Sequence, residues 1–125
     1  MRELVIKKCL KCGAIVKVLQ DCTCPDCGIK CCGEEMKALK ANSVDAASEK
    51  HVPTYEVKGD QVIVKVNHVM EEDHFIEWIA GVSKDTEEFK YLKAGDEAVA
   101  TFKYVKGMVL YSYCNKHLLW KVEVK

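Results

Sequence analysis

The cysteines of this chain fall into two unequal groups. Seven of the eight lie in its first third, whereas Cys114 stands alone three positions before His117. The other three histidines, His51, His68 and His74, lie in the same C-terminal part of the chain. Imidazole nitrogen and thiolate sulfur are both ligands of transition metals. Each part of the chain therefore contains its own candidate metal site.

The C-terminal site would contain four imidazoles and one thiolate. A lone histidine near an apolar strand more often has a structural hydrogen-bonding role, but four histidines with one cysteine are harder to explain in that way. Five ligands are one more than a structural zinc site accepts, and blue copper uses two histidines, one cysteine and a weak axial group. Iron suits the set best, because five protein ligands leave one octahedral position for a small molecule.

Two pairings are open for the N-terminal cysteines. CLKCG and CPDCG are both Cys-x-x-Cys-Gly turns, and together they would form the paired knuckles of a zinc ribbon or a rubredoxin. The alternative joins Cys9 and Cys12 to the adjacent Cys31 and Cys32. Neighbouring side chains of an extended chain point to opposite faces, so such a pair would distort a tetrahedral site. Spacing alone favours the two knuckles.

Charge and hydropathy limit the class of protein. The chain has 125 residues and a formal net charge of zero, which gives no general attraction to nucleic acid or to an anionic membrane. No apolar run approaches the roughly 20 residues of a membrane span, and MRELVIKK has too few apolar residues for a secretory signal. We therefore expect a cytoplasmic protein, whose cysteines serve metals more often than disulfides. A disulfide-stapled secreted domain is the alternative that the cysteine count leaves open.

The elements that must position these residues fall into two predicted domains. Residues 1–37 carry the clustered cysteines and are too few to bury a stabilising core, so they need a staple. Residues 38–48 are small and polar and are interpreted as a linker. Residues 49–125 form the second domain, which contains every histidine.

Short alternating runs in the second domain predict β-strands. Glycines and charged turns such as VKGD and KAGDE separate these runs at intervals of roughly ten residues, as in an antiparallel sandwich or barrel. In the first run, Val62, Val64 and Val66 share one face. The runs are QVIVKV, HFIEWIAGV, EAVATFKY, GMVLYSY and LLWKVEV. No helix is long enough for a bundle, so the predicted fold class is mostly β.

The N-terminal motifs resemble those of a small iron protein. CLKCGAIVKVL followed by CCGEEM is similar to desulforedoxin, in which a Cys-x-x-Cys pair and a Cys-Cys pair hold one iron. This resemblance implies an iron site whose four ligands are Cys9, Cys12, Cys31 and Cys32. The chain departs from that family in QDCTCPDCGIK, which adds Cys22, Cys24 and Cys27. Three roles stay open for the added cysteines: spare thiols, a second metal site, or the true partners of the first pair.

The C-terminal motifs extend the resemblance to nearly the whole chain. EKHVP, HVMEEDHFIEWI and CNKHLLW, in this order, resemble desulfoferrodoxin, a two-iron superoxide reductase of anaerobes whose second domain is neelaredoxin-like. The resemblance implies an immunoglobulin-like antiparallel β-sandwich for residues 49–125. The implied ligands of the catalytic iron are His51, His68, His74 and His117 in the equatorial plane and the Cys114 thiolate on the axis. The active-site lysine and carboxylate of the family fall on Lys50 and Glu49.

The implied activity is one-electron reduction of superoxide to hydrogen peroxide without release of dioxygen. The resemblance also implies two irons per chain, a homodimer, and an electron donor such as rubredoxin. Lys50 would attract the anion and hold a proton-donating water, and Glu49 would occupy the sixth position of ferric iron. The chain departs from the family at Val69, where proline is usual, and at Leu118, where glycine is usual. Both lie beside ligands, so the fine geometry of these loops is open.

Three other functions are compatible with the same residues. A zinc-stabilised binding module with incidental histidines would be colourless and redox-inactive. A superoxide dismutase would also oxidise superoxide at the same site, and a pure electron carrier would perform no chemistry on a substrate. Metal analysis and a visible spectrum are the measurements that best separate these alternatives.

Overall fold

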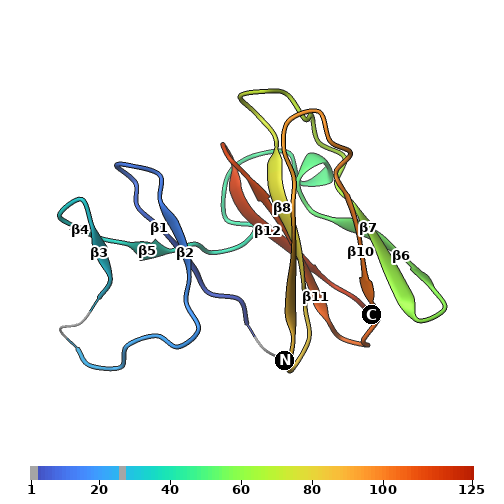
Figure 1. The fold of residues 1–125 in the computed structure, drawn as a ribbon, viewed down its shortest axis with the longest axis horizontal. Coiled ribbons are helices and arrows are strands. Elements are labelled where there is room, and N and C mark those ends of the chain that lie inside the picture. The colour runs from blue at the N-terminus through green and yellow to red at the C-terminus, as the bar shows by residue number, and fades with distance from the viewer. Residues whose placement is uncertain (1–2, 26–27) are drawn as a thin grey trace. The chain divides into compact units, whose positions relative to one another are not determined.

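The computed structural model describes residues 3–25 and 28–125. These residues divide into two compact units, 3–40 and 41–125. Strands form nearly all of the regular structure (Figure 1), and the described residues contain one short 3-10 helix, η1 (Ser48–Lys50), and no α-helix. No helix in this part of the chain is long and apolar enough to cross a membrane. The predicted fold class, mostly β, is confirmed.

The small unit is built from very short antiparallel strands. One sheet has the order β2-β1-β5, with β1 (Ile6–Lys8), β2 (Ile15–Lys17) and β5 (Lys37–Ala38). A separate hairpin contains β3 (Lys30–Cys31) and β4 (Glu34–Glu35). The buried apolar side chains that the structure describes here are Leu4, Ile6, Cys9 and Met36. So small a core cannot offset the ordering of this segment without a further staple.

An ion pair between a buried lysine and an exposed aspartate fastens the long loop of the small unit. Lys7 is 6% exposed, and its Nζ donates to Oδ1 of Asp21 at 3.0 Å. The same oxygen accepts the backbone N–H of Cys22 at 2.9 Å. These bonds, with that from Lys7 the stronger influence, hold the pKa of the Asp21 carboxyl below its ordinary value. The loop that carries Cys22 and Cys24 is thereby tied to β1.

The large unit contains two antiparallel sheets, ordered β10-β7-β6 and β12-β11-β8-β9. The strands of the first sheet are β6 (Thr54–Lys58), β7 (Gln61–Lys65) and β10 (Val99–Lys103). Those of the second are β8 (Ile76–Val82), β9 (Glu87–Tyr91), β11 (Val109–Cys114) and β12 (Leu118–Glu123). Seven antiparallel strands in two sheets are the number and arrangement of an immunoglobulin-like sandwich. The predicted sandwich is therefore confirmed.

Two strands of the large unit are missing from the sequence-based prediction. β6 and β9 lie at the edges of their sheets, and most of their side chains are exposed or half-buried. Edge strands carry charged residues that discourage pairing with other chains. TYEVK and EEFKY contain no buried residue and therefore lack the apolar alternation by which the other five strands, including the edge strands β10 and β12, were recognised.

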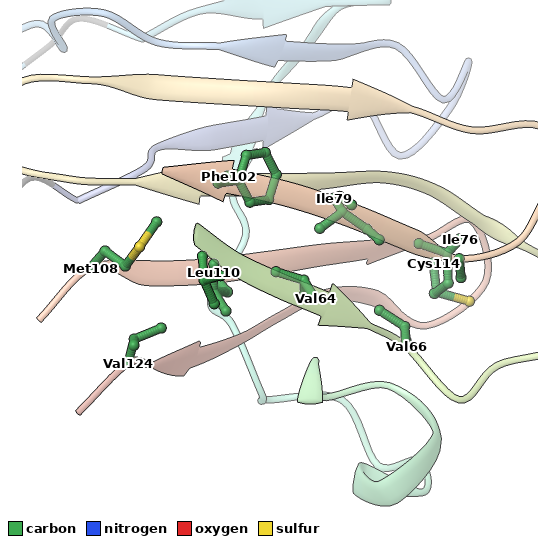
Figure 2. Packing of buried hydrophobic residues seen from close by; sticks show 12 residues of the cluster. Val64, Val66, Ile76, Ile79, Phe102, Met108, Leu110, Cys114 and Val124 are labelled. Carbon is green, nitrogen blue, oxygen red and sulfur yellow. The ribbon is translucent and has the colours of Figure 1, made fainter. Parts of the chain in front are cut away.

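Apolar side chains of both sheets meet in one core, shown in Figure 2. Val64 of β7 and Leu110 of β11 are each 0% exposed within it. Cys114 belongs to the same cluster and lies beside Ile76 at one end, whereas Met108 lies at the opposite end. The packed core thus holds one of the predicted metal ligands in place.

Candidate metal centres

Five predicted ligands converge in the large unit. The coordinating atoms of this group, here called the His/Cys cluster, all lie within 4.8 Å of one another; its members are His51, His68, His74, Cys114 and His117. Each ligand lies at or near the end of a regular element. His51 follows η1, His74 precedes β8, and Cys114 is the last residue of β11. Loops anchored on a rigid sheet therefore bring the five side chains together.

Backbone carbonyls fix two of the imidazoles in one tautomer. His51 Nδ1 lies 2.7 Å from the carbonyl oxygen of Ala47, and His68 Nδ1 lies 2.6 Å from that of Val69. Because a carbonyl oxygen only accepts, each Nδ1 carries the hydrogen and each Nε2 has a lone pair. A bond of this kind commonly orients histidines that bind metals. Both Nε2 atoms contact other members of the cluster.

His74 presents a buried nitrogen without a hydrogen-bond partner. Among the described residues, its Nε2 is the one buried side-chain nitrogen or oxygen atom in this condition. Burial lowers the pKa of His68 and of His74, so both rings favour the neutral form. A buried polar atom without a partner is costly unless a ligand satisfies it. This atom is the clearest local indication that the cluster fits an ion.

The spacing of the ligand atoms also fits a transition metal. Nitrogen ligands at right angles, on bonds of about 2.1 Å, are separated by about 3.0 Å. His51 Nε2 and His117 Nδ1 are 3.0 Å apart. Cys114 Sγ lies 3.4 Å from His68 Nε2 and 3.8 Å from His117 Nδ1, which agrees with a longer metal–sulfur bond. Four imidazole nitrogens and one sulfur can thus share a single ion.

Asn115 joins the loop of His74 to the hairpin that carries Cys114. Its Oδ1 accepts the backbone N–H of Phe75 at 3.0 Å, and its Nδ2 donates to the carbonyl oxygen of Asp73 at 2.9 Å. Its own backbone N–H donates to the carbonyl oxygen of Phe75 at 3.2 Å. These bonds hold the residues on both sides of His74. Asn115 was not among the predicted site residues, although its position inside the Cys-x-x-His turn could have indicated it.

A cavity of about 470 Å³ lies next to His68, and Lys50, Lys65 and Asp96 also line it. Lys50 and the preceding Glu49 belong to η1 and are exposed. The segment that delivers His51 to the cluster therefore also places a cation at the wall of this cavity. Glu49 lies on the same exposed turn.

The second group of predicted ligands lies in the small unit. The sulfur atoms of this group, here called the cysteine cluster, lie within 4.8 Å of one another; its members are Cys9, Cys12, Cys31 and Cys32. Cys12 and Cys31 have their sulfurs 3.6 Å apart, and those of Cys31 and Cys32 are 3.9 Å apart. Sulfurs at the corners of a tetrahedron, on bonds of about 2.3 Å, are about 3.8 Å apart. The spacing fits one ion with four thiolates.

Two tight turns bring the four sulfurs together. In the first, Gly13 has a φ of 82° and its N–H donates to the carbonyl oxygen of Cys9 at 2.9 Å. In the second, Cys32 and Gly33 have φ values of 54° and 79° and connect β3 to β4. Two consecutive positive values are typical of a type I′ hairpin turn. Cys32 therefore leaves the extended conformation in which it would point away from Cys31.

The thiols of the cysteine cluster differ in acidity. Backbone N–H groups, that of Cys12 above all, lower the pKa of Cys9 to about 6. Hydrogen bonding among the thiols, with Cys12 the largest contributor, raises the pKa of Cys31 to about 12. Thiolates this close repel one another, so a cation is needed before all four can ionise.

Two of the three extra cysteines, Cys22 and Cys24, are separate from both clusters. The third, Cys27, lies outside the described residues. Cys22 is disulfide-bonded, which differs from the three roles that the sequence left open. A disulfide and a metal pair have the same composition, so cysteine counting could not separate them.

Comparison with known proteins identifies the family of the chain. A family model described as Desulfoferrodoxin matches residues 43–123, a range that contains the whole His/Cys cluster. A desulfoferrodoxin of Syntrophotalea carbinolica is 42% identical over 125 residues, with 97% of each chain covered. The chain belongs to the desulfoferrodoxin family.

Other relatives of this desulfoferrodoxin family member also span both units. A desulfoferrodoxin of Nitratidesulfovibrio vulgaris is 44% identical over 123 residues, with 94% of each chain covered. The solved structure of the superoxide reductase from Treponema pallidum has a TM-score of 0.72 at 28% identity, covering 97% of this chain and 99% of that one. The resemblance to desulfoferrodoxin that was inferred from the sequence motifs is confirmed.

Proposed function

We propose that this protein is a superoxide reductase, which reduces superoxide to hydrogen peroxide at the His/Cys cluster without releasing dioxygen. The observation that carries the proposal is the convergence of four imidazoles and one thiolate within 4.8 Å. The Treponema pallidum protein with the same fold is a superoxide reductase, which supports the same activity here.

Iron fits both clusters, and we infer two irons per chain. When bound to the His/Cys cluster, ferrous iron would supply the electron that, together with two protons, converts superoxide to hydrogen peroxide. The partnerless Nε2 of His74 and the 3.0 Å separation of the His51 and His117 nitrogens support this assignment. Four thiolates would close the coordination sphere at the cysteine cluster, which therefore suits electron transfer and not substrate binding.

The side chains of the His/Cys cluster have distinct roles in this proposal. Cys114 supplies the one anionic ligand, and its polarisable sulfur enriches the electron density of the site. Its complete burial, at 0% exposure, keeps water from the sulfur. An imidazole that binds a metal does so in its neutral form, so the charge of a bound cation would be only partly cancelled and an anion would still be attracted.

Lys50 is the residue proposed to attract superoxide and to hold the water that donates a proton. Its support is its place in the wall of the cavity beside His68. A local cation can raise the encounter rate with an anion by roughly 10- to 1000-fold, even in a protein without net charge. Glu49, its neighbour in η1, would supply a carboxylate ligand to ferric iron.

The cysteine cluster is proposed to exchange electrons with an external carrier such as rubredoxin. Cys12 and Cys32 are exposed, and Leu10, between the first two ligands, is 72% exposed. A partner protein could therefore approach this cluster closely. The proposal of a homodimer rests on the family resemblance, and that of a cytoplasmic location rests on the expectation that clustered cysteines bind metals in a reducing compartment.

The test is a measurement of the reaction stoichiometry. Reduced protein is mixed with a known amount of superoxide, and peroxide and dioxygen are measured together with the iron content. A superoxide reductase produces one peroxide per superoxide and no dioxygen, whereas a dismutase produces one peroxide and one dioxygen from two superoxides. Zinc in both clusters, or a colourless protein without reaction, would contradict the proposal and favour a binding module.

A further inference from the structure

We propose that Trp120 is a positioning residue that sets the geometry of His51 and His117 in the His/Cys cluster. This inference rests on the proposed metal-binding function of that cluster and extends it to a residue outside the ligand set. It begins with the support that each ligand receives from regular structure. His51 lies between η1 and β6, outside any strand, whereas Cys114 is the last residue of a central strand.

One hydrogen bond does not fix the plane of the His51 ring. The bond from Nδ1 to the carbonyl oxygen of Ala47 selects the tautomer and points Nε2 toward the cluster. The ring can still turn about the line that joins Nδ1 to the carbonyl oxygen of Ala47, and such a turn would misdirect the lone pair of Nε2. A second contact on the face of the ring is therefore required for a defined orientation.

Trp120 provides that contact. Its indole stacks on the His51 imidazole with ring centroids 4.8 Å apart and an interplanar angle of 24°. Offset stacking at this distance is a favourable arrangement of two aromatic rings. Trp120 is 1% exposed, so close packing restricts the indole itself to one rotamer. The plane of the imidazole is thereby restricted as well.

The same indole holds a second ligand. Its Nε1–H donates to the carbonyl oxygen of His117 at 2.9 Å. The coordinating nitrogens of His51 and His117 are the pair separated by 3.0 Å. One rigid ring therefore contacts both partners of this pair, one through its face and the other through its N–H group.

Ser112 reinforces this arrangement from the neighbouring strand. It is the cross-strand partner of Trp120 in the pairing of β11 with β12. Its hydroxyl donates to the carbonyl oxygen of His51 at 2.6 Å, and the residue is 0% exposed. The two opposed residues thus hold His51 by its ring and by its backbone. Neither residue is a metal ligand, so their effect on the metal must act through the histidines.

The test uses the full-length, iron-loaded protein and four variants. Trp120→Leu removes both the stack and the N–H donor, Trp120→Phe keeps a flat ring but loses the donor, and Ser112→Ala removes the hydroxyl. Trp78→Leu is the matched control, because Trp78 is also buried, at 7% exposure, and its ring contacts are with Phe89 and Tyr113. Two properties are measured: ferrous affinity of the His/Cys cluster by chelator competition, and visible absorption after oxidation. The iron of the cysteine cluster serves as an internal reference.

We expect Trp120→Leu to weaken ferrous binding at the His/Cys cluster by about 10- to 100-fold, as is usual when a partner of a metal ligand is removed. Its absorption band from that cluster should also shift. Trp120→Phe should lose less affinity, because a ring that can orient His51 is retained. Ser112→Ala should also bind ferrous iron more weakly than the wild type. Trp78→Leu should keep the affinity and the spectrum of the wild type even if it is less stable to denaturant.

Wild-type affinity and spectrum in Trp120→Leu would overturn the positioning role, and so would an equal loss of affinity in Trp78→Leu. Should Trp120→Leu not fold, Trp120→Phe and Ser112→Ala decide the question, because an unchanged affinity and spectrum in both would overturn it. If the wild-type protein binds iron and reduces superoxide and Trp120→Leu behaves identically, the result contradicts this inference but not the proposed function. A wild-type cluster that binds no iron contradicts the proposed function and the inference together.

Discussion

Leu118 is the cross-strand partner of Cys114 at the end of the β11–β12 hairpin, and its backbone is left-handed, with a φ of 63°. A residue other than glycine, asparagine or aspartate is unfavourable in the left-handed region by about 1–2 kcal/mol. The hairpin that delivers Cys114 and His117 to the cluster thus contains a strained residue directly after the second of these ligands.

The strain at Leu118 predicts that glycine is more stable than alanine at this position, which is the reverse of their order within a strand. Leu118→Gly should be more stable than Leu118→Ala by about 1 kcal/mol, because only glycine relieves the left-handed strain. At Thr101, an exposed residue within β10, the same pair should show the opposite order, since glycine weakens a strand by about 0.5–1 kcal/mol relative to alanine. Denaturant unfolding of the four variants measures both differences. Alanine as the more stable residue at both positions would contradict the strain.

Cys114→Ser tests the proposed electronic role of the thiolate. Peroxide formation should fall by at least about 100-fold, because even residues that only orient a metal ligand contribute about 10- to 100-fold, and the variant loses a ligand itself. The iron of the cysteine cluster should remain, since its four ligands lie in the other unit. Rapid mixing with superoxide and a visible spectrum measure the two effects. Near-normal superoxide reduction would exclude the His/Cys cluster as the reactive site.

Sequence patterns predicted five of the seven strands of the large unit because their residues alternate between a packed core and another surface. β7, with Val62 and Val64 each 0% exposed, shows this alternation plainly. β6 and β9 escaped prediction because neither contains a buried residue, whereas the edge strands β10 and β12 both do. The alternation of apolar residues thus identifies strands that bury side chains in the core, whether or not they lie at the edge of a sheet.

The members of the two clusters could be predicted by residue type, but the geometry that brings them together could not. Nothing in CCGEEM except its glycine indicates that Cys32 has a positive φ, and this conformation is what lets two adjacent sulfurs converge. The roles of Asn115, Ser112 and Trp120 depend on contacts between segments that are distant in sequence or on adjacent strands. Such contacts exist only in the folded chain, so residue spacing does not reveal them.

Lys50→Ala should slow the second-order reaction with superoxide by up to about tenfold and reduce its dependence on ionic strength. A cation at the cavity attracts the anion over a distance that salt screens, with a Debye length of about 10 Å at 0.1 M ionic strength. Lys58→Ala is the control, because this lysine lies at the far end of β6 and pairs with Glu56 at 3.8 Å. Rate constants at several salt concentrations measure the effect. Equal rates and equal salt slopes in the wild type and both variants would leave Lys50 as an ordinary solvated charge.

Cys31→Ser and Cys24→Ser form a matched pair for the small unit, because both remove one thiol from the cysteine-rich segment. Cys31 has its sulfur 3.6 Å from that of Cys12 and belongs to the cysteine cluster, whereas Cys24 does not. Cys31→Ser should therefore lose or bleach the four-cysteine iron, and the small unit should loosen, since its few buried apolar residues cannot hold it without the metal. Cys24→Ser should keep close to two irons per chain.

Metal analysis, the visible spectrum and hydrogen exchange of residues 3–40 measure these outcomes. The His/Cys cluster should keep its iron in both variants, because the large unit has a core of its own. If Cys24→Ser lost the iron and Cys31→Ser retained it, the paired-knuckle arrangement would be the correct one.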